Sequence, residues 1–180
     1  KENKLKVAQK KILFYHPVFL DGGVEKTNLL ISEELSKKYE IFFVSNYFSN
    51  KFDSDIQKIG IKKIKLKSNR TILSIFEFPR IIKEINPDLI FSLQMHANVT
   101  LLILNFLFFF NKLKIISCER LSPQNYNKNF KGKIILFLAK VFYRFSKKII
   151  CNSADLAKEI KNFSKSKNVV FIYNPTLKRN

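Results

Sequence analysis

The sequence contains no tryptophan, and only two of its 180 residues are cysteines. Cys118 and Cys151 each end a short apolar run, and neither has a second cysteine or a histidine at the spacing of a metal site. We therefore expect no bound metal and a reduced, cytosolic interior.

The sequence also lacks a hydrophobic run long enough to cross a membrane. Its most apolar stretch, residues 99–110, is shorter than the roughly 20 residues that a spanning helix needs. No signal-peptide core follows the charged N-terminus before Asp21. We expect residues 99–110 to form a buried or membrane-touching helix.

Arginine is scarce in a chain that is otherwise strongly basic. The net charge is +19, and of the 33 basic residues only five are arginines: Arg70, Arg80, Arg120, Arg144 and Arg179. Because arginine is the side chain that binds phosphate and guanine with two parallel hydrogen bonds, its scarcity argues against a nucleic-acid partner. Diffuse lysine suits an anionic membrane surface, which needs charge without defined geometry. The alternative is A/T-rich coding, in which lysine is the default surface residue.

Short apolar runs alternate with amphipathic segments along the chain. We expect strands at residues 12–15, 40–45, 61–66 (an edge strand), 88–92, 114–117, 148–151 and 169–173. We expect helices at residues 24–35, 72–85, 99–110, 134–145 and 154–163, with a loop at 121–131. This alternation predicts an α/β fold: a doubly wound, mostly parallel Rossmann-like sheet with helices on both faces. We expect residues 1–180 to form a single domain.

Two glycines, Gly22 and Gly23, separate the first predicted strand from the first helix. Glycines let the backbone approach a ligand closely, and the free N–H groups at a helix start favour an anion. The spacing differs from the G-x-G-x-x-G of dinucleotide folds. The segment predicts a phosphate site, with a plain tight turn as the alternative.

Ligands of doubly wound sheets bind at the carboxyl ends of the strands. His96 follows one such end and could hold or deprotonate a substrate hydroxyl, or it could be an exposed or helix-capping histidine. Glu119 and Arg120 follow another end and could bind sugar hydroxyls or a phosphate, or form a solvated loop pair. His16 follows the first strand. Ser153 is better explained as a helix cap than as a nucleophile.

Six short motifs, taken in order, resemble the N-terminal domain of family 4 glycosyltransferases. They are Gly22-Gly23-Val24-Glu25-Lys26, Asn86-Pro87-Asp88-Leu89-Ile90, His96-Ala97-Asn98, Ser117-Cys118-Glu119-Arg120, Cys151-Asn152-Ser153 and Ile172-Tyr173-Asn174-Pro175. The resemblance implies one half of a two-domain GT-B enzyme that retains configuration and needs no metal or other cofactor. It implies a hexosyltransferase that uses a nucleotide sugar and a glycan or lipid-linked acceptor for surface polysaccharide such as lipopolysaccharide. Such an enzyme would be cytoplasmic, with peripheral contact at the anionic inner face of the cell membrane.

The same resemblance assigns roles to residues. It implies that Gly22 and Gly23 approach the donor diphosphate and that His96, Asn98, Glu119 and Arg120 line the acceptor side. Glu119 and His96 are the catalytic candidates. We expect both side chains to converge on one cleft beside the two glycines, because all follow the carboxyl ends of neighbouring strands.

The chain departs from the family pattern in one respect. In the family, the nucleotide-sugar site and its Glu-x7-Glu motif belong to a C-terminal domain, which we expect to be missing here. Glu25 and Glu33 have that spacing, but they lie on the first predicted helix, so we interpret it as coincidence. We expect this chain alone to be inactive. The alternative function is a non-catalytic binding module for a nucleotide, a sugar phosphate or an anionic lipid.

Overall fold

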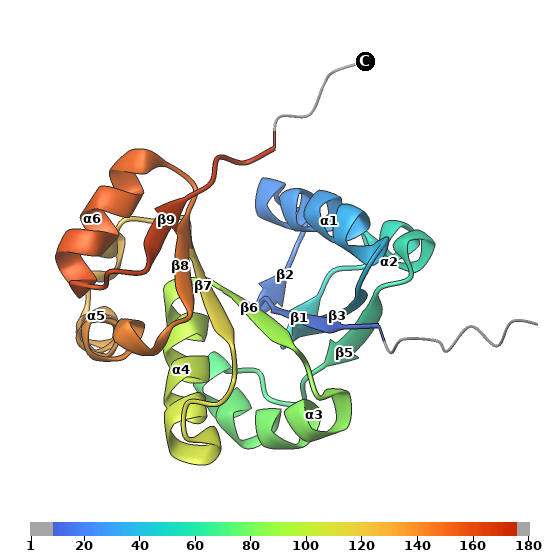
Figure 1. The fold of residues 1–180 in the computed structure, drawn as a ribbon, viewed down its shortest axis with the longest axis horizontal. Coiled ribbons are helices and arrows are strands. Elements are labelled where there is room, and N and C mark those ends of the chain that lie inside the picture. Colours follow the sequence, from blue (N-terminus) through green and yellow to red (C-terminus); the bar gives the residue numbers. More distant parts are fainter. Residues whose placement is uncertain (1–8, 176–180) are drawn as a thin grey trace, which may run out of the picture.

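The computed structural model describes residues 9–175 and shows an α/β fold built on a seven-stranded sheet (Figure 1). All neighbouring strands of this sheet are parallel. Its order is β5-β3-β1-β6-β7-β8-β9. The strands are β1 (Lys11–Tyr15), β3 (Glu40–Ser45), β5 (Lys62–Lys65), β6 (Leu89–Leu93), β7 (Ile115–Glu119), β8 (Lys148–Cys151) and β9 (Val169–Phe171). The predicted fold class is confirmed, and β5 is an edge strand as expected.

Helices cover both faces of the sheet, but unevenly. Helices α1 (Gly23–Ser36) and α2 (Asp53–Ile59) pack on one face, where Leu29 and Ile56 join a core with Phe14 and Phe43. The other face carries four helices and a larger core: α3 (Phe78–Ile85), α4 (Met95–Phe109), α5 (Phe130–Phe142) and α6 (Ala154–Ser164). Figure 1 shows α1 and α2 on the side of the sheet opposite α3 to α6.

Three predicted helices differ from the structure in length or continuity; one of them, predicted at residues 134–145, begins earlier and ends at Phe142. The segment predicted as one helix over residues 72–85 is split into a 3₁₀ helix, η1 (Thr71–Phe76), and α3. Pro79 stands in the first turn of α3, and proline is tolerated there because that turn needs no N–H donor, whereas inside a continuous helix it removes a hydrogen bond and clashes. The helix predicted to begin at Val99 begins at Met95, which places the residues of the His96 motif in its first turn.

The segment predicted as a loop, residues 121–131, is more ordered than expected. It contains the 3₁₀ helix η2 (Pro123–Tyr126) and the start of α5, and a further 3₁₀ turn, η3 (Tyr143–Phe145), follows α5. Asn129 caps α5, because its Oδ1 accepts a hydrogen bond from the N–H of Gly132 at 2.8 Å. Helix α2 and a small parallel ribbon, β2 (Val18–Phe19) with β4 (Tyr47–Phe48), were not predicted.

Gly132 is required where α5 packs on η2. A Cβ at this position would stand 1.7 Å from the carbonyl oxygen of Tyr126. We expect Gly132→Ala to lower the free energy of unfolding by about 1–3 kcal/mol, because backbone must move to make room. Gly23→Ala is the matched control, since a Cβ there meets nothing within 4 Å. Urea denaturation measures both, and equal stabilities would contradict the packing argument.

Candidate functional site

The carboxyl ends of β1, β6 and β7 lie side by side and carry the polar residues of the site. Tyr15 at the end of β1 pairs with Ser92 of β6, and Leu93 of β6 pairs with Cys118 of β7. The residues that follow these strands therefore emerge at one edge of the sheet. Helix α1 begins at the same edge, directly after Gly22.

His16 and Glu25 form a buried pair at this edge. The His16 side chain is 3% exposed, and its Nδ1 lies 3.7 Å from Oε1 of Glu25. The pKa of His16 is lowered to about 4, chiefly by burial; Glu25 opposes this shift, and Arg120 and His96 contribute to it. His16 is therefore neutral at pH 7. Glu25 Oε1 also accepts from the N–H of Leu20 at 3.2 Å, which ties the loop before α1 to the first turn of the helix.

The two glycines have different surroundings. A Cβ on Gly22 would stand 2.7 Å from Oε2 of Glu25, so Gly22 makes room for this carboxylate. Gly23 borders open space, since a Cβ there would meet nothing within 4 Å. The N-cap residue of α1 is Gly22, which offers no side chain to cap the helix. Its first N–H groups are therefore available to an anion beside Gly23.

Arg120 crosses from β7 to α1. Its Nη2 donates to Oδ1 of Asn28 at 3.1 Å, and its Nη1 donates to Oδ1 of Asn174 at 3.3 Å. Burial lowers the pKa of Arg120. The Nδ2 of Asn28 is buried and has no hydrogen-bond partner among the described residues. A buried amide donor without a partner costs free energy, so this atom is available to a ligand acceptor.

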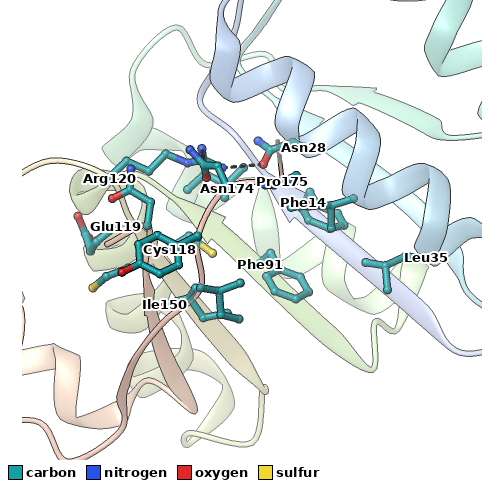
Figure 2. Close-up of a pocket in the computed structure, with 16 residues that line it drawn as sticks. Phe14, Asn28, Leu35, Phe91, Cys118, Glu119, Arg120, Ile150, Asn174 and Pro175 are labelled. Atoms are coloured by element: carbon teal, nitrogen blue, oxygen red, sulfur yellow. Dashed lines mark hydrogen bonds between the residues drawn. The ribbon is translucent and has the colours of Figure 1, made fainter. Parts of the chain in front are cut away.

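A cavity of about 470 Å³ lies between α1 and the uncovered strands β7 and β8. Figure 2 shows the hydrogen bond from Arg120 to Asn28 close to Asn174, while Phe91 and Ile150 lie along the apolar part. The other lining residues include Phe14, Ile31, Leu35, Leu93, Cys118, Asn152, Ile172 and Tyr173. The cavity is therefore an apolar chamber with a cationic, amide-rich end.

Glu119 takes part in a different, fully buried network. Its side chain is enclosed, and Oε1 accepts from Nδ2 of Asn98 at 2.6 Å and from the hydroxyl of Tyr143. These partners come from α4 and η3, on the face opposite α1. Burial raises the pKa of Glu119 to about 7 and raises that of Tyr143 well above its ordinary value. Because side chains alternate along a strand, Glu119 and its neighbour Arg120 serve different faces of the sheet.

His96 lies in the first turn of α4. Its side chain is half-buried, and burial lowers its pKa. The residue before Met95, Gln94, has φ 86° and ψ 141°, a strained backbone for a side chain other than glycine. The Nε2 of Gln94 lies 3.5 Å from Nε2 of His16. This strained residue therefore lies between the end of β6 and the start of α4, next to the His96 motif.

The structure thus brings together some of the predicted residues and adds others. Gly22, Gly23 and Arg120 lie with His16 at the α1 side of the edge, and His96 is near enough to lower the pKa of His16. The side chains of Asn98 and Glu119 face α4 and η3, so the predicted convergence of Glu119 and His96 on one cleft beside the glycines is wrong for Glu119, whose carboxyl group is directed to the opposite face by the pleat of β7. Ser153 caps α6 as predicted, since its Oγ accepts from the N–H of Leu156 at 3.2 Å.

Glu25 and Asn28 were not among the predicted site residues. In the structure Glu25, Asn28 and Ser32 are buried, and polar residues three and four apart on one helix face were the available signal.

Residues 9–175 contain neither a cluster of metal ligands nor a helix that could span a membrane. Within residues 9–175, no three or more histidine, cysteine, aspartate or glutamate side chains gather as a metal site would require. In the same part of the chain, no helix combines the length and the apolar character needed to cross a membrane.

Comparisons with known proteins assign the chain to a family. The sequence profile described as Glycosyltransferase Family 4 matches residues 21–176. A comparison with curated proteins gives no match.

Solved structures show the same fold at low identity. Anabaena HepE in complex with UDP-glucose matches with a TM-score of 0.70 at 16% identity, over 92% of this chain and 44% of that one. The lipopolysaccharide outer core galactosyltransferase WaaB matches with a TM-score of 0.66 at 17% identity, over 93% and 46%. A glycosyltransferase from Rickettsia africae matches with a TM-score of 0.63 at 16% identity, over 92% and 43%. This chain spans less than half the length of these proteins. It belongs to glycosyltransferase family 4 and has the fold of one half of a GT-B enzyme.

Proposed function

We propose that the chain is the acceptor-side, N-terminal domain of a retaining hexosyltransferase that acts in surface polysaccharide synthesis. The complete enzyme would transfer a sugar from a nucleotide sugar to a glycan or lipid-linked acceptor at the inner face of the cell membrane. Family membership supports the reaction class. The similar structures add two indications, since WaaB is a lipopolysaccharide galactosyltransferase and HepE was solved with UDP-glucose.

One observation carries the proposal: groups that suit a sugar diphosphate converge where α1 begins. The cationic Arg120, the unpartnered Nδ2 of Asn28 and the neutral His16 lie at the carboxyl edge of the sheet, beside an uncapped helix. Positive charge and free N–H groups stabilise a leaving diphosphate. In this proposal Gly22 and Gly23 let the diphosphate approach the backbone, and no metal or other cofactor is needed.

His96 is the proposed group on the acceptor side. Because burial lowers its pKa, its imidazole is neutral at pH 7 and can accept the proton of an acceptor hydroxyl. In the reaction the acceptor oxygen forms a bond to the anomeric carbon of the sugar, and the bond from that carbon to the diphosphate oxygen breaks. Arg120 completes this side of the proposed site, while the buried Asn98 connects Glu119 to the first turn of α4.

Glu119 contributes to the proposed site as a positioning residue. Its carboxyl group holds Asn98, two residues beyond His96 in the first turn of α4. The same carboxyl group holds Tyr143 after α5. Glu119 therefore fixes the start of α4, and with it the direction of His96, relative to β7.

Residues 1–180 alone should transfer no sugar, because in the proposed enzyme a second domain binds the nucleotide sugar and this chain contacts only its diphosphate. The test incubates the purified chain with nucleotide sugars and lipid-linked acceptors and detects products by mass spectrometry. The positive control is the same chain joined to a donor-binding domain of the family. Transfer by the isolated chain would refute the division of roles between the domains.

The same experiment separates enzyme from binding module. If the joined protein also transfers nothing while the chain binds a nucleotide, a sugar phosphate or an anionic lipid, the non-catalytic alternative is correct. Binding that weakens steeply with salt and shows no sugar preference would instead indicate a nucleic-acid partner.

A further inference from the structure

A second cavity lies at the amino edge of the sheet, where the strands begin, so it is at the opposite end of the strands from the candidate site. Its volume is about 330 Å³, which suits a small molecule. Its walls come from residues in or next to β1, β6, β7 and the end of α1. This amino-edge cavity is lined by Lys10, Ile12, Leu35, Tyr39, Asp88, Leu89, Phe91 and Lys114.

Most of the surface inside this cavity is apolar. Side chains alternate along a strand, so Ile12 of β1 and Leu89 and Phe91 of β6 all lie on the α1 side of the sheet. Leu35 and Tyr39, at the end of α1 and just after it, pack against the same core. Leu35, Tyr39, Leu89 and Phe91 are only half-buried. An apolar ligand group in the cavity would therefore remove their exposed surface from water, which favours binding.

Three exposed lysines border this apolar surface. Lys10 and Lys114 line the cavity from the positions directly before β1 and β7. Lys148, the first residue of β8, pairs in register with Ile116, and alternation along β7 places Ile116 on the same face as Lys114. The ion pairs found within residues 9–175 involve other residues. The three positive charges therefore remain available to an anionic ligand.

One carboxylate, that of Asp88, also lines the cavity, and the fold already uses it. Its Oδ2 accepts a hydrogen bond from the backbone N–H of Lys11 at 2.8 Å, and the N–H of Asp88 donates to the carbonyl oxygen of Lys11 at 2.9 Å. Asp88 therefore joins the starts of β1 and β6, which gives the Asn86-Pro87-Asp88 motif a structural role. Because three lysines face this one carboxylate, the cavity and its rim carry net positive charge, which attracts anions.

We propose that the amino-edge cavity binds a small amphiphilic anion, a molecule that joins an apolar ring or short chain to a phosphate or carboxylate group. The apolar part would lie on Ile12, Leu89 and Phe91, and the anionic group would meet the lysines at the rim. Both parts are needed, because an ion pair at an exposed lysine contributes little by itself. Neither a bare inorganic anion nor a neutral apolar molecule would use all of these contacts.

The amino-edge cavity shares two of its residues with the larger cavity beside Arg120. Leu35 and Phe91 line both cavities, and Figure 2 shows Leu35 beside α1 and Phe91 on the neighbouring strand. A ligand that packs on Leu35 would touch the helix whose first turn borders the candidate site. The cavity is therefore placed to hold an effector of that site. This consequence rests on the proposed function, whereas the binding site itself does not.

A titration of the full chain, followed by two-dimensional amide NMR, tests this proposal. The probe is naphthyl phosphate, which joins an apolar double ring to a phosphate group. We expect saturable binding, with the largest shift changes at the backbone amides of Leu35, Tyr39, Leu89 and Lys114. Naphthol lacks the charge and inorganic phosphate lacks the ring, so each should bind at least about fivefold more weakly than the probe.

Lysine variants separate the cavity from the general charge of the chain. Lys10→Gln combined with Lys114→Gln should weaken binding of naphthyl phosphate about tenfold, because each exposed ion pair contributes up to about fivefold. Both side chains are exposed, so the fold should be kept. The matched control, Lys158→Gln combined with Lys161→Gln, makes the same change in net charge on exposed residues of α6, which packs on the opposite face of the sheet. The control variant should bind like the unchanged chain.

The candidate site at the carboxyl edge also attracts phosphate, and Arg120→Gln distinguishes the two sites. Shift changes confined to the amides of Gly23, Asn28 and Arg120, with binding lost in Arg120→Gln but kept in the Lys10 and Lys114 variant, would overturn the proposal. Equal weakening in test and control variants would also overturn it, as would the absence of saturable binding. Because the titration needs no sugar transfer, binding at the amino edge by a chain whose joined enzyme transfers nothing would refute the proposed function and keep this site.

Discussion

Raising the pH from 5 to 8 should destabilise the protein by about 3 kcal/mol through Glu119 alone. Burial raises the pKa of this carboxyl group from an ordinary 4.5 to about 7 in the folded chain. Between these values the folded state holds a proton that the unfolded state has released. Its contribution to stability is therefore complete below pH 4.5 and is lost as the pH rises through about 7, at about 1.4 kcal/mol per pKa unit.

Glu119→Gln isolates this contribution. The amide oxygen can accept the hydrogen bonds of Asn98 and Tyr143, but the side chain does not titrate. Urea denaturation of both proteins at several pH values gives the difference in their unfolding free energies. We expect that difference to shift by about 3 kcal/mol in favour of the variant between pH 5 and pH 8. His16, whose pKa is lowered, titrates equally in both proteins and cancels. A difference that stays constant with pH would show that Glu119 is not protonated in the folded chain.

His96→Ala should lower kcat by about 100-fold or more in the enzyme that joins this chain to a donor-binding domain. Its position in the first turn of α4, beside the strained Gln94, suits a group that is held in place for proton transfer. Because burial lowers its pKa, the rate should be constant near neutral pH and fall on the acid side as the imidazole becomes protonated.

The residual activity of the His96→Ala variant should not show this fall in rate on the acid side. Gln57→Ala, on the exposed side of α2, is a control that should change neither quantity. Thermal unfolding and circular dichroism check that the His96 variant keeps its fold. A variant with full activity would remove His96 from the site, and a variant with low activity but an unchanged pH profile would assign it a structural role.

Much of the architecture follows from the sequence by itself. The apolar runs are short and are separated by amphipathic segments, so parallel strands with crossover helices are the arrangement that buries them. The carboxyl edge, the two glycines before α1 and the Ser153 cap follow from the same order of elements. Helix starts were less certain because they depend on contacts. Residues 95–98 become helical where α4 packs on the sheet, and Phe130 begins α5 because Asn129 and Gly132 fit against η2.

The tertiary structure decided which face of the sheet each polar side chain serves. Glu119 and Arg120 are neighbours in the sequence, but the pleat of β7 and the helices on each side send them to a buried network and to a cavity, respectively. Glu25 and Asn28 are likewise buried because α1 begins at the carboxyl edge of the sheet, where Glu25 pairs with His16 after β1 and Asn28 accepts from Arg120 after β7. Pairings between residues this far apart depend on the register of distant strands, which local sequence does not encode.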